Sequence, residues 1–198
     1  MKKLQRFVNA FFELADEKPI AKISIEELCN RVGVKRQTFY YHFDSMGDFI
    51  HAVLEDFVEH RADKEGGFSS DVRFVADIYS KYAGAIRNVL ISPYALDVTN
   101  FLHNYLYLRS NNRIATNPKY KNLPSQQVAS VSRIVASILV TEFSFWVQSN
   151  LQEDKEHLIH RFEVMLKNIE KMMVENALHD SINKPIKPDD TSEKTDKH

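Results

Sequence analysis

The sequence predicts an all-helical protein with a small N-terminal three-helix domain and a larger C-terminal one. Glycine and proline are scarce, with five and six among 198 residues, which favours helices over a strand-rich chain with many turns. Apolar residues recur at intervals of three and four along most of the chain, as on one face of an amphipathic helix. With 43% apolar residues, the chain is long enough to bury a sizeable core.

Composition also indicates where the protein works. The single cysteine, Cys29, excludes an intramolecular disulfide and a zinc site built from several cysteines, which fits a reducing compartment. The first 19 residues are interrupted by acidic and amide side chains and do not form a convincing signal peptide. The longest uncharged apolar stretch near the centre, 134–141, is far shorter than the ~20 residues that a bilayer helix needs. We therefore expect a cytoplasmic protein that does not enter a membrane.

A helix-turn-helix is predicted near the N-terminus. A first amphipathic helix carries apolar residues at helical spacing until Pro19 ends the pattern. Ser24 and Glu27 form a capping box at the start of a second helix, and Gly33 stands where a left-handed residue would end it. A third helix should follow over about 35–43, after a gap of three or four residues. Two short helices joined in this way are typical of the helix-turn-helix arrangement.

Longer helices are predicted in the rest of the chain. A fourth helix starts at Ser45 and links two domains, because its apolar pattern continues past the point where the N-terminal domain is complete. Further helices are expected at about 71–91, 94–109, 125–149 and 155–178. The predicted organisation is an N-terminal domain over 1–55, a helical domain over 56–179, and a polar, disordered tail over 180–198.

Positive charge is concentrated on the predicted helix-turn-helix. The whole chain has a net charge of −1, yet residues 28–43 contain no acid and include Arg31, Lys35 and Arg36. Contact with phosphates supplies much of a protein's affinity for DNA, so a positive segment centred on this motif indicates DNA binding. The alternative is an ordinary helical hairpin with a solvated basic face, which charge and spacing alone do not exclude.

The third helix also carries side chains suited to reading DNA. A helix advances about 100° per residue, so with Phe39 facing the core, Gln37 and Tyr41 point away from it. Thr38 and Tyr40 then lie on the flanks. Glutamine can pair with adenine, threonine offers a hydroxyl and a methyl group, and the two phenols can reach phosphates. For Tyr41, packing against neighbouring helices is an equally good interpretation.

The run from 32 to 43, Val-Gly-Val-Lys-Arg-Gln-Thr-Phe-Tyr-Tyr-His-Phe, resembles the DNA-binding signature of the TetR family of transcriptional regulators. The resemblance covers about the first 55 residues. It implies contacts with bases or phosphates from Arg36, Gln37, Thr38, Tyr40, Tyr41 and His42. Ser24 takes the place of the threonine that commonly caps the second helix, and it completes the predicted DNA-binding set together with Lys35.

Two positions depart from the family's pattern. The family usually has a basic residue, most often lysine, where this chain has Met46, and commonly a serine or threonine near Lys35. The missing lysine would remove one phosphate contact at the start of the fourth helix. Backbone N–H groups near Ser45 and Gly47 could still receive a phosphate there, and Lys35 could compensate.

The resemblance further implies that the domain over 56–179 binds an effector. Family members usually hold a small-molecule pocket among these helices, although aromatic side chains at helical spacing more often form core. The candidate pocket residues are Tyr82, Phe101, Tyr105, Phe143 and Trp146. The C-terminal half also bears a weaker resemblance to a TetR branch that includes the dihydroxyacetone-kinase regulators, which respond to a protein partner. The effector is therefore either a small molecule or a protein.

A second acid-free stretch, 98–141, holds five basic residues, namely Arg109, Arg113, Lys119, Lys121 and Arg133. It could attract an anionic effector, whereas a solvated loop around Asn117 needs no ligand. No enzyme, metal site or cofactor is expected. His157 and His160 lie near two glutamates, but a zinc centre needs a further positioned ligand, and no nucleophile elbow or phosphate loop occurs.

The helices over 125–149 and 155–178 are predicted to form a two-fold homodimer as a four-helix bundle. Their apolar residues extend beyond the stripe that covers one subunit, at Ile134, Val140, Trp146, Met165, Met172, Met173 and Val174. Such a dimer would read a palindromic operator in double-stranded DNA. The function expected first is a repressor released by an effector. The alternatives are a partner-dependent activator and a helical interaction module that no longer binds DNA.

Overall fold

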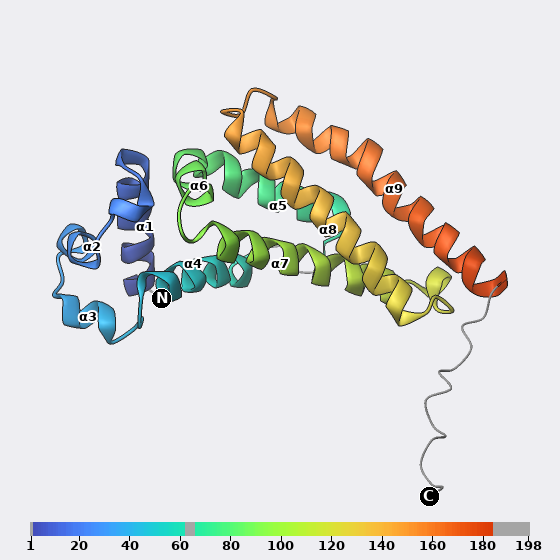
Figure 1. Cartoon of the computed structure of the whole chain (residues 1–198), viewed down its shortest axis with the longest axis horizontal. Helices are drawn as coiled ribbons and strands as arrows, with labels where there is room; N and C mark the ends of the chain where they lie inside the picture. Colours follow the sequence, from blue (N-terminus) through green and yellow to red (C-terminus); the bar gives the residue numbers. More distant parts are fainter. Residues whose placement is uncertain (1, 62–65, 184–198) are drawn as a thin grey trace, which may run out of the picture.

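The computed structural model describes residues 2–61 and 66–183, which contain helices and no strand (Figure 1). The predicted all-helical class is confirmed. The elements in order are α1 (Lys2–Glu17), the short 3₁₀ helix η1 (Ile20–Lys22), α2 (Ile25–Val32), α3 (Arg36–Tyr40), α4 (Met46–Glu59), α5 (Phe68–Lys81), α6 (Ala83–Leu90), α7 (Ala95–Ala115), the 3₁₀ helix η2 (Pro118–Tyr120), α8 (Ser125–Gln148) and α9 (Lys155–Asn183).

Capping residues set the ends of the N-terminal helices, as the sequence predicts. At the start of α2, the Ser24 hydroxyl accepts a hydrogen bond of 3.1 Å from the backbone N–H of Glu27. At the start of α4, the Ser45 hydroxyl accepts one from the N–H of Asp48. Gly33 ends α2 with a φ of 75°, a left-handed conformation that glycine adopts at little cost. The chain then turns into α3, which completes the helix-turn-helix.

The segment predicted as one helix over 71–91 is two helices, α5 and α6. They meet at Tyr82, whose backbone is not helical, with φ −119° and ψ 32°. The Tyr82 ring stacks on Phe12 of α1 with 3.9 Å between ring centroids. A long-range contact thus accompanies a break that the local apolar pattern does not reveal.

Two helices run further than predicted. α7 continues past residue 109 to Ala115, and α9 continues past residue 178 to Asn183. Residues 180–183, which the sequence assigns to the tail, are therefore helical. The rest of the predicted disordered tail, 184–198, lies outside the described residues.

The buried side chains form two clusters. One lies among α1 to α4 and also takes in Ala85 and Val89 of α6, so that α6 joins the N-terminal helices to the rest of the protein. The other lies among α5, α7, α8 and α9. Figure 1 shows α1 to α3 at one end of the molecule, α4 alongside α7, and the long helices α8 and α9 beyond them.

α8 is the central helix of the second cluster. By length and composition it is the one helix among the described residues that could cross a membrane. The uncharged stretch 134–141, considered alone, is too short to indicate this. Apolar and small side chains of α8 are buried inside the protein at helical spacing, from Val128 to Val147, against α7, α5 and α9. Part of its hydropathy is thus explained by this position in the core, and 44% of its most apolar window is buried.

Candidate nucleic-acid interface

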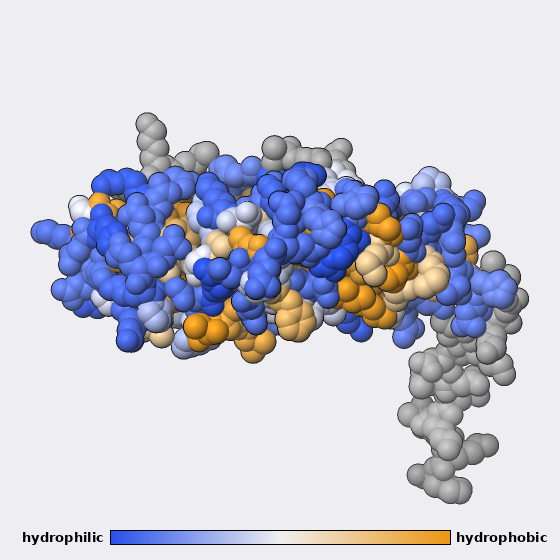
Figure 2. All heavy atoms as spheres, turned by 90° about the horizontal axis from the view of Figure 1, so that it is seen from above, coloured by the Kyte–Doolittle hydropathy of each residue, from blue (hydrophilic) through white to orange (hydrophobic). Residues whose placement is uncertain are grey.

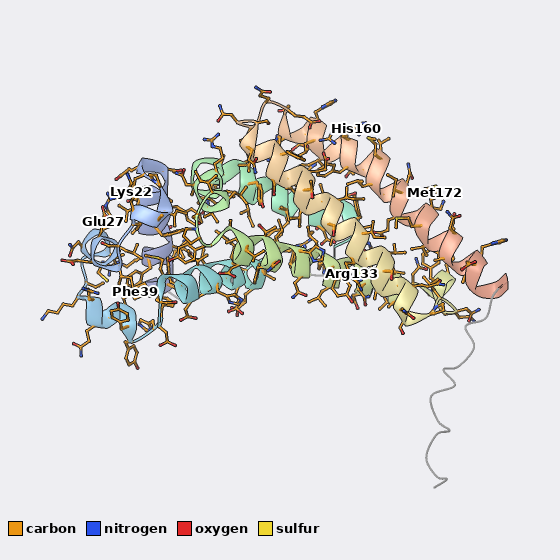
Figure 3. The ribbon with its side chains drawn as sticks, in the orientation of Figure 1. Lys22, Glu27, Phe39, Arg133, His160 and Met172 are labelled. Atoms are coloured by element: carbon orange, nitrogen blue, oxygen red, sulfur yellow. The ribbon has the colours of Figure 1, made fainter. Side chains whose placement is uncertain are left out.

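The position of α3 is fixed by one aromatic side chain. Phe39 is fully buried, and its ring lies 5.8 Å from Phe7 and 5.9 Å from Phe49, centroid to centroid. Figure 3 labels Phe39 on α3, below α2 and α1. Edge and tilted ring contacts of this kind add to the stability gained from burial. With Phe39 held in the core, the opposite face of α3 must lie at the surface.

The predicted DNA-reading side chains lie on that surface. Tyr41 is 83% exposed, Tyr40 is 46% exposed, and Gln37 is exposed between them, whereas Thr38 is half-buried. The helix orientation deduced from the sequence agrees with these exposures. Packing of Tyr41 against neighbouring helices, the alternative interpretation, does not occur because most of its surface is open.

Lys35, Arg36 and His42 are exposed beside them. Lys35 occupies the N-cap of α3 and makes no side-chain capping hydrogen bond. Arg36 lies close to Tyr40, with 3.4 Å from Nη2 to the phenol oxygen. Ser24 is exposed as well, and because its oxygen only accepts in the cap, its O–H can still donate to a phosphate.

Arg31 does not contribute to this positive surface as the sequence suggests. Its guanidinium binds both carboxylate oxygens of Glu17, at 3.1 and 3.0 Å, and a carboxylate oxygen of Glu13 at 3.3 Å. The hydrogen bond from Arg31 lowers the pKa of Glu17. The positive charge that faces outward beside α3 is therefore that of Lys35 and Arg36, and Arg36 lies 4.0 Å from a carboxylate oxygen of Glu26.

Met46 is buried, with 7% of its surface exposed, in the cluster that holds Phe39 and Phe49. The sequence suggests that this residue stands where a phosphate contact is missing, but its side chain points into the core. Asp48 stands in the first turn of α4, where its carboxylate accepts a hydrogen bond of 3.0 Å from the N–H of Asp44. A negative charge thus already occupies the start of this helix.

Two of the five predicted effector residues lie together. Phe101 and Tyr105 line an apolar cavity of about 60 Å³ between α4, α5 and α7. Tyr82 instead stacks on Phe12 and lies beside Phe57, where α1, α4 and α5 meet.

The remaining two, Phe143 and Trp146, are buried in the core and line neither of these places. Phe143 is fully buried between Tyr79 and Phe162. Trp146 is also buried, and its indole N–H donates to the backbone oxygen of Glu153 at 2.7 Å. Their aromatic character serves packing, as is common for such residues at helical spacing.

A buried ionic cluster between α4 and α9 was missed by the sequence reasoning. Asp71 is 2% exposed and binds three guanidiniums, those of Arg61, Arg109 and Arg113, at 2.7, 2.7 and 2.9 Å. Arg113 also binds Glu170 of α9 at 2.7 Å. The partners come from four separate segments of the chain. The acid-free stretch 98–141 was the one signal in the sequence that could have indicated this cluster. Two of its basic residues bind these carboxylates, and Lys119 pairs with Glu175.

No group of three or more histidines, cysteines or carboxylates that could hold a metal occurs in the described part of the chain. His157 lies 2.9 Å from Glu153, which also binds Arg161 at 2.8 Å. The hydrogen bond from Arg161 lowers the pKa of Glu153. These residues link α9 to the loop that precedes it.

An exposed, positively charged helix that follows a glycine turn defines the class of helix-turn-helix regulatory proteins. Residues 8–53 match the bacterial regulatory proteins of the tetR family. The N-terminal helix-turn-helix is therefore of the tetR type, as the sequence signature indicates.

Individual relatives agree with this assignment. The uncharacterized HTH-type transcriptional regulator YvdT of Bacillus subtilis (strain 168) is 31% identical over 65 residues, which are 33% of this chain and 34% of the relative. The match thus spans about a third of that protein's length.

Two solved structures share the fold. The dihydroxyacetone kinase operon activator DhaS superposes with a TM-score of 0.60 at 12% identity, over 87% of this chain and 96% of its own. A tetR-family transcriptional regulator from Streptomyces coelicolor superposes with a TM-score of 0.56 at 14% identity, over 90% of this chain and 89% of its own. The likeness to the dihydroxyacetone-kinase regulators extends over the C-terminal helices, as a likeness of fold.

Proposed function

We propose that the protein is a cytoplasmic transcriptional regulator that binds a palindromic operator in double-stranded DNA as a homodimer and leaves it when an effector binds. The observation that carries this proposal is the outward face of α3. Phe39 fixes the helix from inside while Gln37, Tyr40 and Tyr41 face solvent. Residues 1–55 would read the DNA, and residues 56–179 would bind the effector and form the dimer.

Each exposed residue has a role that suits its chemistry. The Gln37 amide can pair with adenine in the major groove, and Thr38 can contact a thymine methyl group. Lys35, Arg36 and His42 supply positive charge for phosphates, Tyr40 and Tyr41 reach the backbone with their phenols, and the Ser24 hydroxyl donates to a phosphate. A helix-turn-helix dimer places two such faces about a helical turn of DNA apart, or a multiple of it.

An exposed apolar face on α8 and α9, seen among the apolar surface patches in Figure 2, supports the dimer. We define it by Ile134, Phe145, Val164, Met165 and Met172, which are between 46% and 64% exposed. Large apolar side chains in such numbers at one surface are typical of an interface. A two-fold axis through this face would bury it as a four-helix bundle.

The sequence expected other residues on this face as well. Val140, Trp146 and Val174 are buried in the subunit's own core, and Met173 is half-buried. A substitution at Trp146 would therefore disrupt the fold, so it cannot test the dimer. Phe145 and Met172 are the positions that can (Figure 3 labels Met172). A monomeric protein in sedimentation, or a dimer that survives glutamate at both positions, would contradict the proposed interface.

The size of the cavity beside Phe101 and Tyr105 bears on the effector. Its 60 Å³ holds a few water molecules at most, since one needs about 10–15 Å³ measured in this way. Ligand pockets are usually of the order of 300–1,000 Å³. An effector inside this apolar cavity would have to open the helices apart, whereas a hollow of about 420 Å³ between α4 and α7, which Phe101 and Tyr105 also line, is already formed.

A second candidate function is favoured by the small volume of this apolar cavity. A regulator that responds to a protein partner needs no preformed pocket, and the fold resembles that of DhaS, which is named as an operon activator. A partner-dependent activator is therefore the alternative.

DNA binding itself is tested with fragments from upstream of the protein's own gene, at several salt concentrations. We expect tight, salt-dependent binding to one fragment and a loss of discrimination in Gln37→Ala and Tyr41→Ala. A good base contact contributes about 1–3 kcal/mol of discrimination. Equal binding to all fragments by the unchanged protein would favour the interaction module without specific DNA binding.

A further inference from the structure

A basic cavity lies beside the ionic cluster, away from the apolar cavity. It measures about 670 Å³ and lies between the start of α5, the end of α7 and the middle of α9. Its charged lining residues are Arg113, Lys167, Lys171 and Glu170, and its polar ones include Ser69 and Asn117. The volume falls within the range of pockets that hold small ligands, of the order of 300–1,000 Å³.

The charges around this cavity do not balance. Three cations and one carboxylate line it, which gives a net charge of +2. Beneath it, among the described residues, Asp71 binds Arg61, Arg109 and Arg113, and Glu170 binds Arg113. At the edge, Lys119 and Glu175 neutralise each other. Lys167 and Lys171 are exposed and Arg113 is half-buried, and all three attract an anion that enters the cavity.

The backbone adds to the positive potential. α5 is 14 residues long and begins after Gly67, with no side chain capping its first turn. Gly67, Phe68, Ser69 and Ser70 all line the cavity, so the positive end of the helix dipole faces it. Asp71 also lies in this first turn, but its carboxylate is bound by three guanidiniums. Backbone N–H groups in the first turn of a helix bind carboxylates and phosphates.

The cavity is separate from the proposed dimer face. Lys167 and Lys171 lie one turn apart on the side of α9 that faces α5 and α7. Met165 and Met172 lie on another side, since each residue advances the helix by about 100°. A dimer formed through the methionines would leave the two lysines accessible.

We infer that this cavity is the site of a small anionic effector with at least two negative charges, carried on phosphate or carboxylate groups. Its anionic groups contact Arg113, Lys167, Lys171 and the start of α5. An anion on Arg113 competes with Glu170 for the guanidinium. Arg113 shares Asp71 with Arg61, which directly follows α4, so the competition reaches the helix that carries the reading domain.

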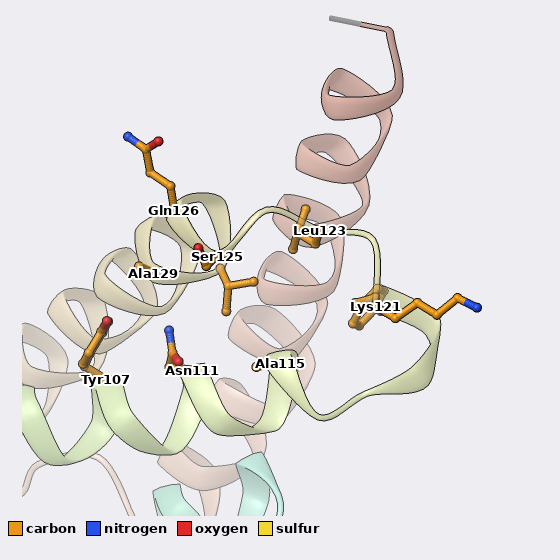
Figure 4. Close-up of a pocket in the computed structure, with 10 residues that line it drawn as sticks. Tyr107, Asn111, Ala115, Lys121, Leu123, Ser125, Gln126 and Ala129 are labelled. Atoms are coloured by element: carbon orange, nitrogen blue, oxygen red, sulfur yellow. The ribbon is translucent and has the colours of Figure 1, made fainter. Parts of the chain in front are cut away.

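A neighbouring pocket provides the matched control. It measures about 510 Å³, lies between the end of α7 and the start of α8, and is lined by neutral polar residues such as Asn111 and Gln126, with Lys121 at its edge (Figure 4). Figure 4 shows the Lys121 side chain extending away from this pocket. Lys121 is exposed and does not line the basic cavity, so Lys121→Gln removes one nearby positive charge without touching the proposed site.

The test is calorimetry on the full-length protein at fixed ionic strength, with pyrophosphate and, separately, citrate as probes. We expect wild type to bind at least one of them. The double variant Lys167→Gln with Lys171→Gln should bind that probe with an affinity at least about tenfold lower, the usual effect of losing hydrogen bonds to charged groups. Lys121→Gln should bind as wild type does. Preference for one probe tells whether phosphate or carboxylate is the natural group.

Two outcomes would overturn the inference. One is that wild type binds neither probe, and the other is that the double variant binds as tightly as Lys121→Gln, which would place the anion elsewhere. The role as effector rests on the proposed function and is measured next, as operator affinity with and without the probe at matched ionic strength. Anion binding with unchanged operator affinity would refute that role, whereas a protein that binds the probe but no operator would refute the proposed function instead.

Discussion

The two halves of the molecule are held together by different interactions. In the N-terminal half, Phe7, Phe39, Phe43 and Phe49 pack ring against ring, with centroids 5.1–6.2 Å apart. In the other half, a buried carboxylate is surrounded by guanidiniums. All the polar and charged side chains that are buried among the described residues belong to this second half, namely Arg61, Asp71, Ser110 and Ser132.

This difference indicates that the two halves differ in how readily their contacts can rearrange. Close-packed rings lose contacts with any displacement, so α3 has one well-defined position. Arg113, in contrast, is shared between Asp71 and Glu170, and an anion can take the place of either. Charged groups in a buried network are strongly coupled, because each depends on its partners for compensation. We therefore propose that the N-terminal half holds a fixed DNA-reading surface and that the C-terminal half holds contacts that a ligand rearranges.

The largest expected effect breaks the aromatic core. Phe39→Ala should lower the free energy of unfolding by about 3–5 kcal/mol, because it empties a fully buried site. Urea denaturation measures the loss. Tyr41→Ala on the exposed face of the same helix is the control, and we expect it to lie within about 0.5 kcal/mol of wild type while weakening DNA binding. Similar losses in both variants would show that α3 is oriented differently.

The second prediction removes the charge at the centre of the ionic cluster. Asp71→Asn keeps the shape but leaves three guanidiniums without their shared carboxylate, so we expect a loss of about 3 kcal/mol. The matched control on the same helix is Asp77→Asn, whose exposed pair with Lys155 should contribute about 0–1 kcal/mol. Both values come from denaturation curves. A loss at Asp71 no larger than that at Asp77 would mean that packing alone holds this half together.

The same contrast explains what could be predicted from the sequence. In the N-terminal half, Ser24 and Gly33 act within a few residues, and the helical spacing around Phe39 indicates which face of α3 is buried. The caps, the turn and the helix face were therefore all predicted. The break at Tyr82 depends on Phe12, 70 residues away, and no local pattern contains it.

The ionic cluster depends on the same kind of distant contact, since Asp71 lies 38 and 42 residues from Arg109 and Arg113. The pocket residues are hard to predict for another reason. Aromatic spacing does not distinguish a side chain that lines a cavity from one that fills the core, as Phe143 and Trp146 do.

A third prediction concerns Met46, where the family's pattern suggests lysine. Because Met46 packs beside Phe39 and Phe49, Met46→Lys should lower the free energy of unfolding by about 1–3 kcal/mol instead of strengthening DNA binding. Ile91→Lys, at a position 77% exposed, is the control and should change stability by less than about 0.5 kcal/mol. Unchanged stability together with a steeper salt dependence would show that the new side chain reaches a phosphate.

The smallest expected effect separates the contribution of Lys35 to stability from its contribution to DNA binding at the start of α3. Lys35 occupies the N-cap without a capping hydrogen bond, so Lys35→Ser should raise the free energy of unfolding by about 1 kcal/mol. The same change removes one exposed positive charge, so the slope of log affinity against log salt should become shallower by about one. Lys35→Gln separates the two effects, because glutamine removes the charge but is a poor cap. We expect the shallower slope in both variants and the added stability only with serine. A slope that stays unchanged in both would place Lys35 away from the phosphates and leave Arg36 as the main cation of the reading surface.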